Sequence, residues 1–182
     1  MTGTQMNETQ IASFLLRGHS EAVAQLRLAG AVGTSLLELL EQDHAAIMAQ
    51  LDGLCERADR DLAQLRPEFL AVQMMLVAHS LAEERVLYAR LKQHESAFQL
   101  ALESGADHEM FGRLIEDLSG LDLGREQWFT LLRSLRDLVQ QHVETEESEV
   151  FEKARELFDQ ADLKTLAADM RAEENRILTC VA

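Results

Sequence analysis

The scarcity of helix-breaking residues constrains the fold of this chain more than any other feature. Only one proline and nine glycines occur among 182 residues, so long segments can stay helical without the penalty that either residue imposes inside a helix. Ala, Leu, Glu, Gln and Arg dominate the remainder, and all five favour helices. We therefore expect an all-α protein. The length and an apolar content of 47% suffice for one domain with a sizeable core.

Four stripes of residues at helical spacing predict the helices of a bundle. A cap at Thr34 or Ser35 would start the first helix, and Pro67 suits the first turn of the second. The third would end at Ser119-Gly120, and the fourth would begin near Gly124. Short connections are typical of an antiparallel up-down four-helix bundle. The stripes are Leu36, Leu37, Leu40, His44, Ile47, Met48, Leu51 and Leu54; Phe69, Val72, Leu76, His79, Glu83, Val86, Leu87 and Leu91; Phe98, Ala101, Gly105, His108, Gly112, Ile115 and Leu118; and Trp128, Leu131, Leu135, Val139, His142, Glu146 and Val150.

Two amphipathic segments flank this predicted bundle. We expect residues 1–33 to form an N-terminal helical extension, residues 34–160 to form the bundle, and residues 161–182 to form a C-terminal helix that packs on it. The N-terminal helix could also join two copies of the chain into a homo-oligomer.

The composition argues against several classes of function. A formal charge of −15 would repel the phosphate backbone of nucleic acid. No apolar run approaches the roughly 20 residues that span a bilayer, and the first ten residues do not resemble a secretory signal. Cys55 and Cys180 lie too far apart in sequence for a thiolate metal motif. We expect a cytoplasmic protein that contacts neither nucleic acid nor membrane.

An internal repeat relates the two halves of the bundle. Asp43-His44 in the first predicted helix matches Asp107-His108 in the third. The segment HSLAEERVLY, from His79, matches HVETEESEVF, from His142, with two adjacent Glu residues and an aromatic ring at the same positions. The third helix therefore echoes the first, and the fourth echoes the second.

The repeated residues have the character of metal ligands. Glu83 and Glu146 fall on inward stripes, where an unpaired carboxylate would be costly, and the stripes supply no Lys or Arg beside them. Each lies four residues after a histidine, so both side chains reach the same point in the interior. Four inward histidines on four helices complete the pattern. The candidate metal ligands are His44, His79, Glu83, His108, His142 and Glu146.

Imidazole and carboxylate ligands without thiolate suit iron, and also manganese or zinc. Two sets of ligands indicate two ions bridged by the carboxylates. A ferritin-type centre would need more Glu-x-x-His pairs than the single one at Glu41 to His44, and Gly112 stands where a zinc-protease motif starting at His108 needs its second histidine. Glu84 and Glu147 could support the site or serve as alternative ligands, while His19 and His94 are expected at the surface.

Taken together, Asp43-His44, His79-x3-Glu83, Asp107-His108 and His142-x3-Glu146 resemble the hemerythrin family, specifically its HHE cation-binding branch, over roughly residues 35–155. The resemblance implies a non-heme di-iron centre, oxo- or hydroxo-bridged, in which Glu83 and Glu146 bridge the ions. The four histidines of the candidate set would then be terminal ligands.

The sequence departs from the oxygen-carrying hemerythrins at two places. Gly112 replaces their second histidine on the third helix, and Glu146 lies four residues after His142, where the carriers have Asp at five. The set is similar to that of HHE proteins associated with nitric-oxide stress and iron-sulfur repair, and of an iron-sensing domain in a ubiquitin-ligase subunit. We favour a protein that binds or senses oxygen or nitric oxide at an open iron position, without assigning catalytic residues. A redox enzyme acting on peroxide or nitric oxide and an iron-handling module acting through a protein partner remain alternatives.

Overall fold

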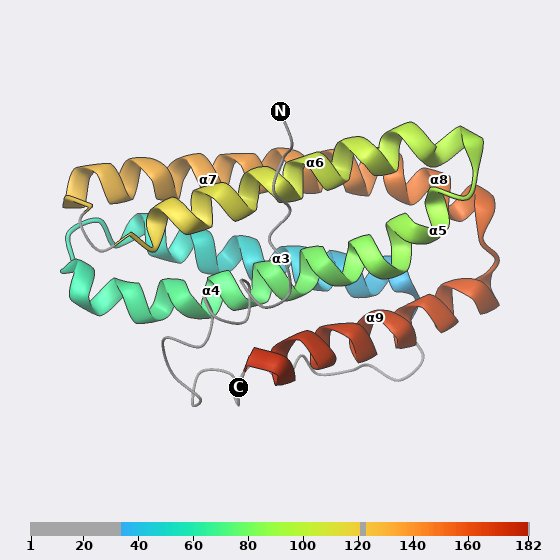
Figure 1. Ribbon diagram of the computed structural model, residues 1–182, viewed down its shortest axis with the longest axis horizontal. Helices are drawn as coiled ribbons and strands as arrows, with labels where there is room; N and C mark the ends of the chain where they lie inside the picture. The colour runs from blue at the N-terminus through green and yellow to red at the C-terminus, as the bar shows by residue number, and fades with distance from the viewer. Residues whose placement is uncertain (1–33, 121–122, 182) are drawn as a thin grey trace.

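The described part of the chain is a bundle of helices. The computed structural model describes residues 34–120 and 123–181, and contains no strand within them. Four long helices run antiparallel to their neighbours in the chain (Figure 1): α3 (Leu36–Glu56), α4 (Leu62–Glu83), α6 (Glu95–Leu118) and α7 (Arg125–Thr145). α3 packs on α4 and α7, and α6 packs on α7. The predicted all-α four-helix bundle is confirmed, whereas the predicted helix within residues 1–33 lies outside the described residues.

Side-chain caps fix where the first two helices begin. The Ser35 hydroxyl accepts a hydrogen bond from the Glu38 N–H at 3.4 Å, and the Glu38 carboxylate accepts one from the Ser35 N–H at 3.0 Å, which is a capping box. Asp61 caps α4 by accepting from the Ala63 N–H. Pro67 therefore lies inside α4. The prediction that it begins this helix was wrong, because the aspartate cap upstream starts it earlier.

Two short π-helical segments widen the helices at points of the repeat that differ by one residue. η1 (Glu84–Tyr88) follows α4 and leads into α5 (Ala89–Leu91), and η2 (Glu146–Val150) follows α7 and leads into α8 (Phe151–Leu157). A π segment adds residues to a turn and so rotates the side chains that follow it. As a result the fully buried ring beyond α4 is Tyr88, whereas Val86, predicted on the inward stripe, is half-buried.

Two apolar clusters fill the two ends of the bundle. One contains Trp128, Phe69 and Leu118, and the other contains Leu40 and Phe151. The inward polar residues of α3, α4, α6 and α7 lie between these clusters. Phe98, predicted on the buried face of α6, is instead 47% exposed.

A further helix, α9 (Gln160–Val181), follows α8 and packs along α3 and α4, at the lower edge of Figure 1. Its buried face carries Leu166, Met170 and Ile177, which join the apolar cluster at that end of the bundle. None of the described helices is both long enough and apolar enough to cross a bilayer.

Candidate metal centre

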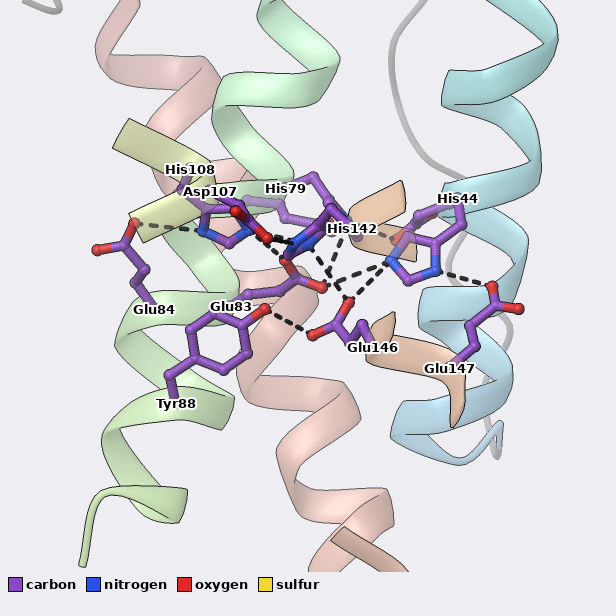
Figure 2. A network of polar contacts seen from close by, with 12 residues as sticks. His44, His79, Glu83, Glu84, Tyr88, Asp107, His108, His142, Glu146 and Glu147 are labelled. Atoms are coloured by element: carbon purple, nitrogen blue, oxygen red, sulfur yellow. Dashed lines mark hydrogen bonds and ion pairs between the residues drawn. The ribbon is translucent and has the colours of Figure 1, made fainter. Parts of the chain in front are cut away.

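The bundle interior brings all six candidate ligands into one layer (Figure 2). Each of the four long helices contributes one histidine, and every one of these imidazoles turns its Nε2 atom toward the two glutamates. Glu83 ends α4 and Glu146 starts η2, so both carboxylates leave the backbone where a helix widens. We refer to His44 and His79 as the α3–α4 half of the centre, and to His108 and His142 as the α6–α7 half.

Glu83 lies between imidazoles of both halves. Its Oε1 is 3.1 Å from Nε2 of His79 and 3.7 Å from Nε2 of His44. Its Oε2 is 3.4 Å from Nε2 of His108. The side chain is fully buried. A carboxylate in this place can serve the α3–α4 half with one oxygen and the α6–α7 half with the other.

Glu146 faces the same point from the opposite helix. Its Oε2 is 3.1 Å from Nε2 of His44 and 3.8 Å from Nε2 of His142, so it too touches both halves. Within the α6–α7 half, Nε2 of His108 lies 3.2 Å from Nε2 of His142. Four imidazole nitrogens and two carboxylates thus enclose a space of a few ångströms.

Several of these enclosed polar atoms have no hydrogen-bond partner within the described residues. They are Nε2 of His44, both ring nitrogens of His79, both carboxylate oxygens of Glu83 and Oε2 of Glu146. Buried polar atoms are rarely left without a partner, because the desolvation cost is then uncompensated. Here the Nε2 and carboxylate atoms among them converge on the space between the two halves. A cation coordinated at that point would satisfy them together, so the residues present fit a metal.

In the absence of a cation, protons have to balance the buried carboxylates. Burial alone would lower the pKa of His44, but close contact with the negative charges of Glu146 and Glu83 outweighs it and raises the pKa to about 11. For His108, contacts with Glu83 and Glu84 likewise overcome burial and raise the pKa to about 9. Burial opposes the ionised form of Glu83, yet the surrounding imidazoles hold its pKa well below the usual range. The negative charge of the two buried carboxylates, Glu83 and Glu146, therefore dominates the electrostatics of the centre.

A second layer of carboxylates faces the outer nitrogens of the four histidines, and Figure 2 labels three of these carboxylates, Glu84, Glu147 and Asp107. Nδ1 of His44 lies 2.9 Å from Glu147, and Nδ1 of His108 lies 3.3 Å from Glu84. These two glutamates directly follow the inward Glu of their own helix. An acceptor at Nδ1 holds the proton there and leaves Nε2 free to coordinate a metal.

Aspartates supply the other two outer contacts. Nδ1 of His142 lies 3.4 Å from Asp107, and Nδ1 of His79 lies 3.9 Å from Asp43, which is within ion-pair range but too long for a hydrogen bond. Each aspartate precedes the histidine of its own helix and reaches the histidine of the next. The sequence repeat therefore describes an approximate two-fold relation between the halves.

The matched aromatic rings of the repeat break this relation. Tyr88 stacks on His108 at 5.5 Å between ring centroids, and Phe151 stacks on His44 at 6.2 Å. The Tyr88 hydroxyl donates a hydrogen bond of 2.7 Å to Glu146, a contact that a phenylalanine cannot make. Burial, and then the charges of Glu146 and Glu83, raise the pKa of Tyr88 well above its usual value. The phenol therefore keeps its proton.

A small cavity, about large enough for a single water molecule, adjoins the imidazoles on the side of the Trp128 cluster. His44, His79 and His142 border it, and the rest of its wall is apolar; the other lining residues are Ile47, Leu76, Phe111, Val139 and Val143. At Gly112, one turn beyond His108 on α6, a Cβ would meet no atom within 4 Å apart from the backbone of its own helix.

Sequence reasoning missed three contributors to the centre. Asp43 and Asp107 were recognised only as part of the repeat, and Tyr88 only as an aromatic position. Their repetition beside His was the available signal for the aspartates. Two histidines were set apart from the site: His94 lies against Phe158, remote from the six candidate ligands, and His19 lies outside the described residues.

Among the candidate ligands, two groups of three residues have ligand atoms within 4.8 Å of one another and could each hold a metal ion: His44, His79 and Glu83, and Glu83, His108 and His142. Comparison with known proteins supports this chemistry. The family model described as the Hemerythrin HHE cation binding domain matches residues 35–154, from the cap of α3 into α8. No curated protein matches the chain, and no solved structure does. The matched region covers well over half of the chain and contains all six candidate ligands, so the protein belongs to the hemerythrin HHE cation-binding family.

Proposed function

We propose that this protein is a non-heme di-iron protein that binds or senses a small diatomic molecule, oxygen or nitric oxide. The observation that carries the proposal is the convergence of four imidazole Nε2 atoms on two buried carboxylates. Several of these imidazole and carboxylate atoms have no hydrogen-bond partner in the described chain. Family membership supports a cation in this place.

The arrangement of the carboxylates favours two ions over one. Glu83 belongs to both of the groups of candidate ligands that could hold a metal, and Glu146 also touches a histidine of each half. Under the proposal, Glu83 and Glu146 bridge the ions. His44 and His79 are then terminal ligands of one ion, and His108 and His142 are terminal ligands of the other.

The type of donor favours iron. Imidazole and carboxylate donors suit iron, manganese and zinc, but structural zinc sites usually take four tetrahedral ligands. Here four imidazoles and two carboxylates surround the space, and none of the described cysteines contributes a thiolate. Iron would supply an open coordination position and a change of oxidation state.

The surroundings favour a small uncharged ligand. The cavity beside His44, His79 and His142 is closed in by apolar side chains, which offer nothing to a charged or large molecule. Gly112 places no side chain near the α6–α7 half, where a further imidazole would otherwise compete for the metal. The chain itself thus binds the ions, excludes bulk water and shapes the space beside them.

Nearby protons are held at defined atoms. The Tyr88 hydroxyl keeps its proton directed at Glu146, and Glu147, Glu84 and Asp107 keep protons on the Nδ1 atoms of their histidines. These contacts fix the tautomers that leave Nε2 available.

Metal analysis and absorption spectra test the proposal. Anaerobically purified, iron-loaded protein should contain close to two irons per chain, and its spectrum should change on separate addition of oxygen or nitric oxide and revert when the gas is removed. A His94→Ala variant removes a histidine outside the centre and should behave like the parent. Iron content below one per chain would refute the di-iron site. Rapid, repeated consumption of peroxide would indicate that the protein is a redox enzyme and not a protein that binds or senses a diatomic ligand.

A further inference from the structure

The C-terminal helix α9 reaches the back of the metal centre through one partly buried arginine. Arg171 donates to both carboxylate oxygens of Asp43, at 2.8 and 2.9 Å, and also to Glu174 at 2.7 Å. Asp43 and Glu174 are buried, and the Arg171 side chain is 14% exposed. α9 lies beyond the residues that match the family model. A segment outside the matched bundle therefore touches a residue that faces one of the candidate ligands.

Asp43 stands between this arginine and His79. The oxygen that accepts from Arg171 at 2.8 Å is the same Oδ2 that lies 3.9 Å from Nδ1 of His79. Nδ1 of His79 has no hydrogen-bond partner within the described residues. Asp43, His79 and Glu174 are also close enough together to hold a cation, but the guanidinium of Arg171 already lies on both carboxylates.

The matching pair in the other half lacks this arginine. Asp107 occupies the position of Asp43 in the repeat and lies 3.4 Å from Nδ1 of His142. Its side chain is 37% exposed, and no arginine in the described chain pairs with it. The shorter contact therefore belongs to the aspartate that has no guanidinium behind it.

We infer that Arg171 is a positioning residue for the metal centre: by taking both oxygens of Asp43, it keeps that carboxylate from bonding to His79 and makes the α3–α4 half unlike the α6–α7 half. This inference rests on the proposed function only in calling the centre a metal site. An outer carboxylate orients a ligating imidazole and raises its basicity, so a carboxylate already shared with a guanidinium does so more weakly.

The structure also predicts the result of removing the arginine charge. Without the guanidinium, Asp43 would remain beside His79, whose Nδ1 lies 3.9 Å from its Oδ2. The carboxylate should then move toward the spacing seen between Asp107 and His142. The consequence is a stronger hydrogen bond at Nδ1 of His79, with no corresponding change at His142.

An Arg171→Gln variant tests the inference, and Glu173→Gln is its matched control. Glu173 lies on the same helix and pairs with Arg85 and Arg176, so its loss weakens the docking of α9 without touching Asp43. Nitrogen-15 and proton NMR of the histidine rings should be recorded on the metal-free protein and on protein loaded with zinc, which is diamagnetic. Only Arg171→Gln should move the Nδ1 signals of His79, in the direction of stronger hydrogen bonding, while the His142 signals stay in place.

Two results would overturn the inference. One is an unchanged His79 signal in folded Arg171→Gln protein, and the other is an equal change in the Glu173→Gln control, which would reduce Arg171 to a docking contact. If Arg171→Gln does not fold, Arg171→Lys keeps the charge but not the two-oxygen contact, and should shift His79 in the same direction by a smaller amount. Failure of the parent protein to bind zinc or iron would count against the proposed function, whereas the metal-free spectra would still decide the role of Arg171.

Discussion

The two halves of the centre are built from the same residues and differ in what surrounds them. In the α3–α4 half, Asp43 is buried beneath α9 and shared with Arg171, and a plain phenylalanine, Phe151, stacks on His44. In the α6–α7 half, Asp107 is partly exposed and pairs with no arginine of the described chain, and Tyr88 stacks on His108. The repeat thus supplies the candidate ligands, and single residues outside that set make the surroundings of the two halves unequal.

A third difference lies one turn beyond the first histidine of each half. Met48 follows His44 at the spacing at which Gly112 follows His108. Met48 packs against the Trp128 cluster. A Cβ added at Gly112 would meet no atom within 4 Å apart from the backbone of its own helix. The α6–α7 half is therefore the more open one on that side.

Loss of a shared carboxylate should have the largest effect. Because Glu83 touches histidines of both halves, Glu83→Gln should remove both ions, whereas His44→Ala should mainly remove the ion of the α3–α4 half. Metal content after iron loading, measured beside the exposed Glu149→Gln variant as a control, distinguishes the two losses. Equal metal content in Glu83→Gln and His44→Ala would show that this carboxylate does not bridge the halves.

Removal of metal should make stability depend strongly on pH. The pKa values of His44 and His108 are raised to about 11 and about 9, so their contribution to the free energy of unfolding is complete below about pH 6.5 and is lost as the pH rises through those values. The pKa of Glu83 is lowered, so its contribution is present above about pH 4.5 and is lost in acid. The metal-free protein should be most stable between these limits.

The affinity for metal should instead increase as the pH rises, because coordination requires neutral imidazoles and so releases protons. The difference in Tm between iron-loaded and chelated protein should therefore widen from pH 6 to pH 9. Thermal unfolding of both forms at each pH measures it. A chelated protein that becomes more stable over this range would contradict the assigned protonation of His44 and His108.

Replacing Tyr88 with phenylalanine, which makes it like its repeat partner Phe151, should have an effect of intermediate size. Tyr88→Phe removes a buried hydrogen bond to a carboxylate and should lower the free energy of unfolding by about 1.5–3 kcal/mol. It leaves the stacking on His108 in place, so the protein should still take up its full complement of metal. Denaturant unfolding and metal analysis separate the two effects, and Phe151→Tyr provides the reciprocal variant. A Tyr88→Phe protein that loses metal as readily as Glu83→Gln would give the phenol a much larger role than its single hydrogen bond indicates.

Periodicity in the sequence was enough to predict the bundle and to select the six residues that meet in its interior. Residues three and four apart share a helix face, so the phase of His79 and Glu83 could be read without knowing their neighbours. That phase holds only while the helix stays regular. The π segment after Glu83 shifted the buried ring to Tyr88, and Phe98, assigned to the buried face of α6, proved to be exposed.

Contacts between helices were beyond the reach of the same reasoning. Asp43 and Asp107 each serve the histidine of the next helix, which depends on how adjacent helices are rotated about their axes. Arg171 lies in a helix whose register on the bundle follows from packing. The repeated Asp-His pairs were the only sequence signal for the aspartate contacts, and nothing in the sequence indicated the contact made by Arg171.

The smallest change should come from filling the space at Gly112. A Gly112→His side chain would begin where no atom lies within 4 Å apart from the backbone of its own helix, one turn from His108, and could offer a further imidazole to the ion of the α6–α7 half. Replacing a helical glycine can itself add up to about 1 kcal/mol of stability, so Tm alone cannot judge the variant. The better measure is the lifetime of the absorption change caused by oxygen, relative to the rate of peroxide consumption, at equal iron content. If openness at Gly112 controls reactivity, this ratio should rise in Gly112→His and stay constant in Met48→Leu, the conservative change at the matching place in the other half. A ratio that stays at the parent value, although spectroscopy places the new imidazole on iron, would mean that the difference between Gly112 and Met48 does not govern the chemistry of the centre.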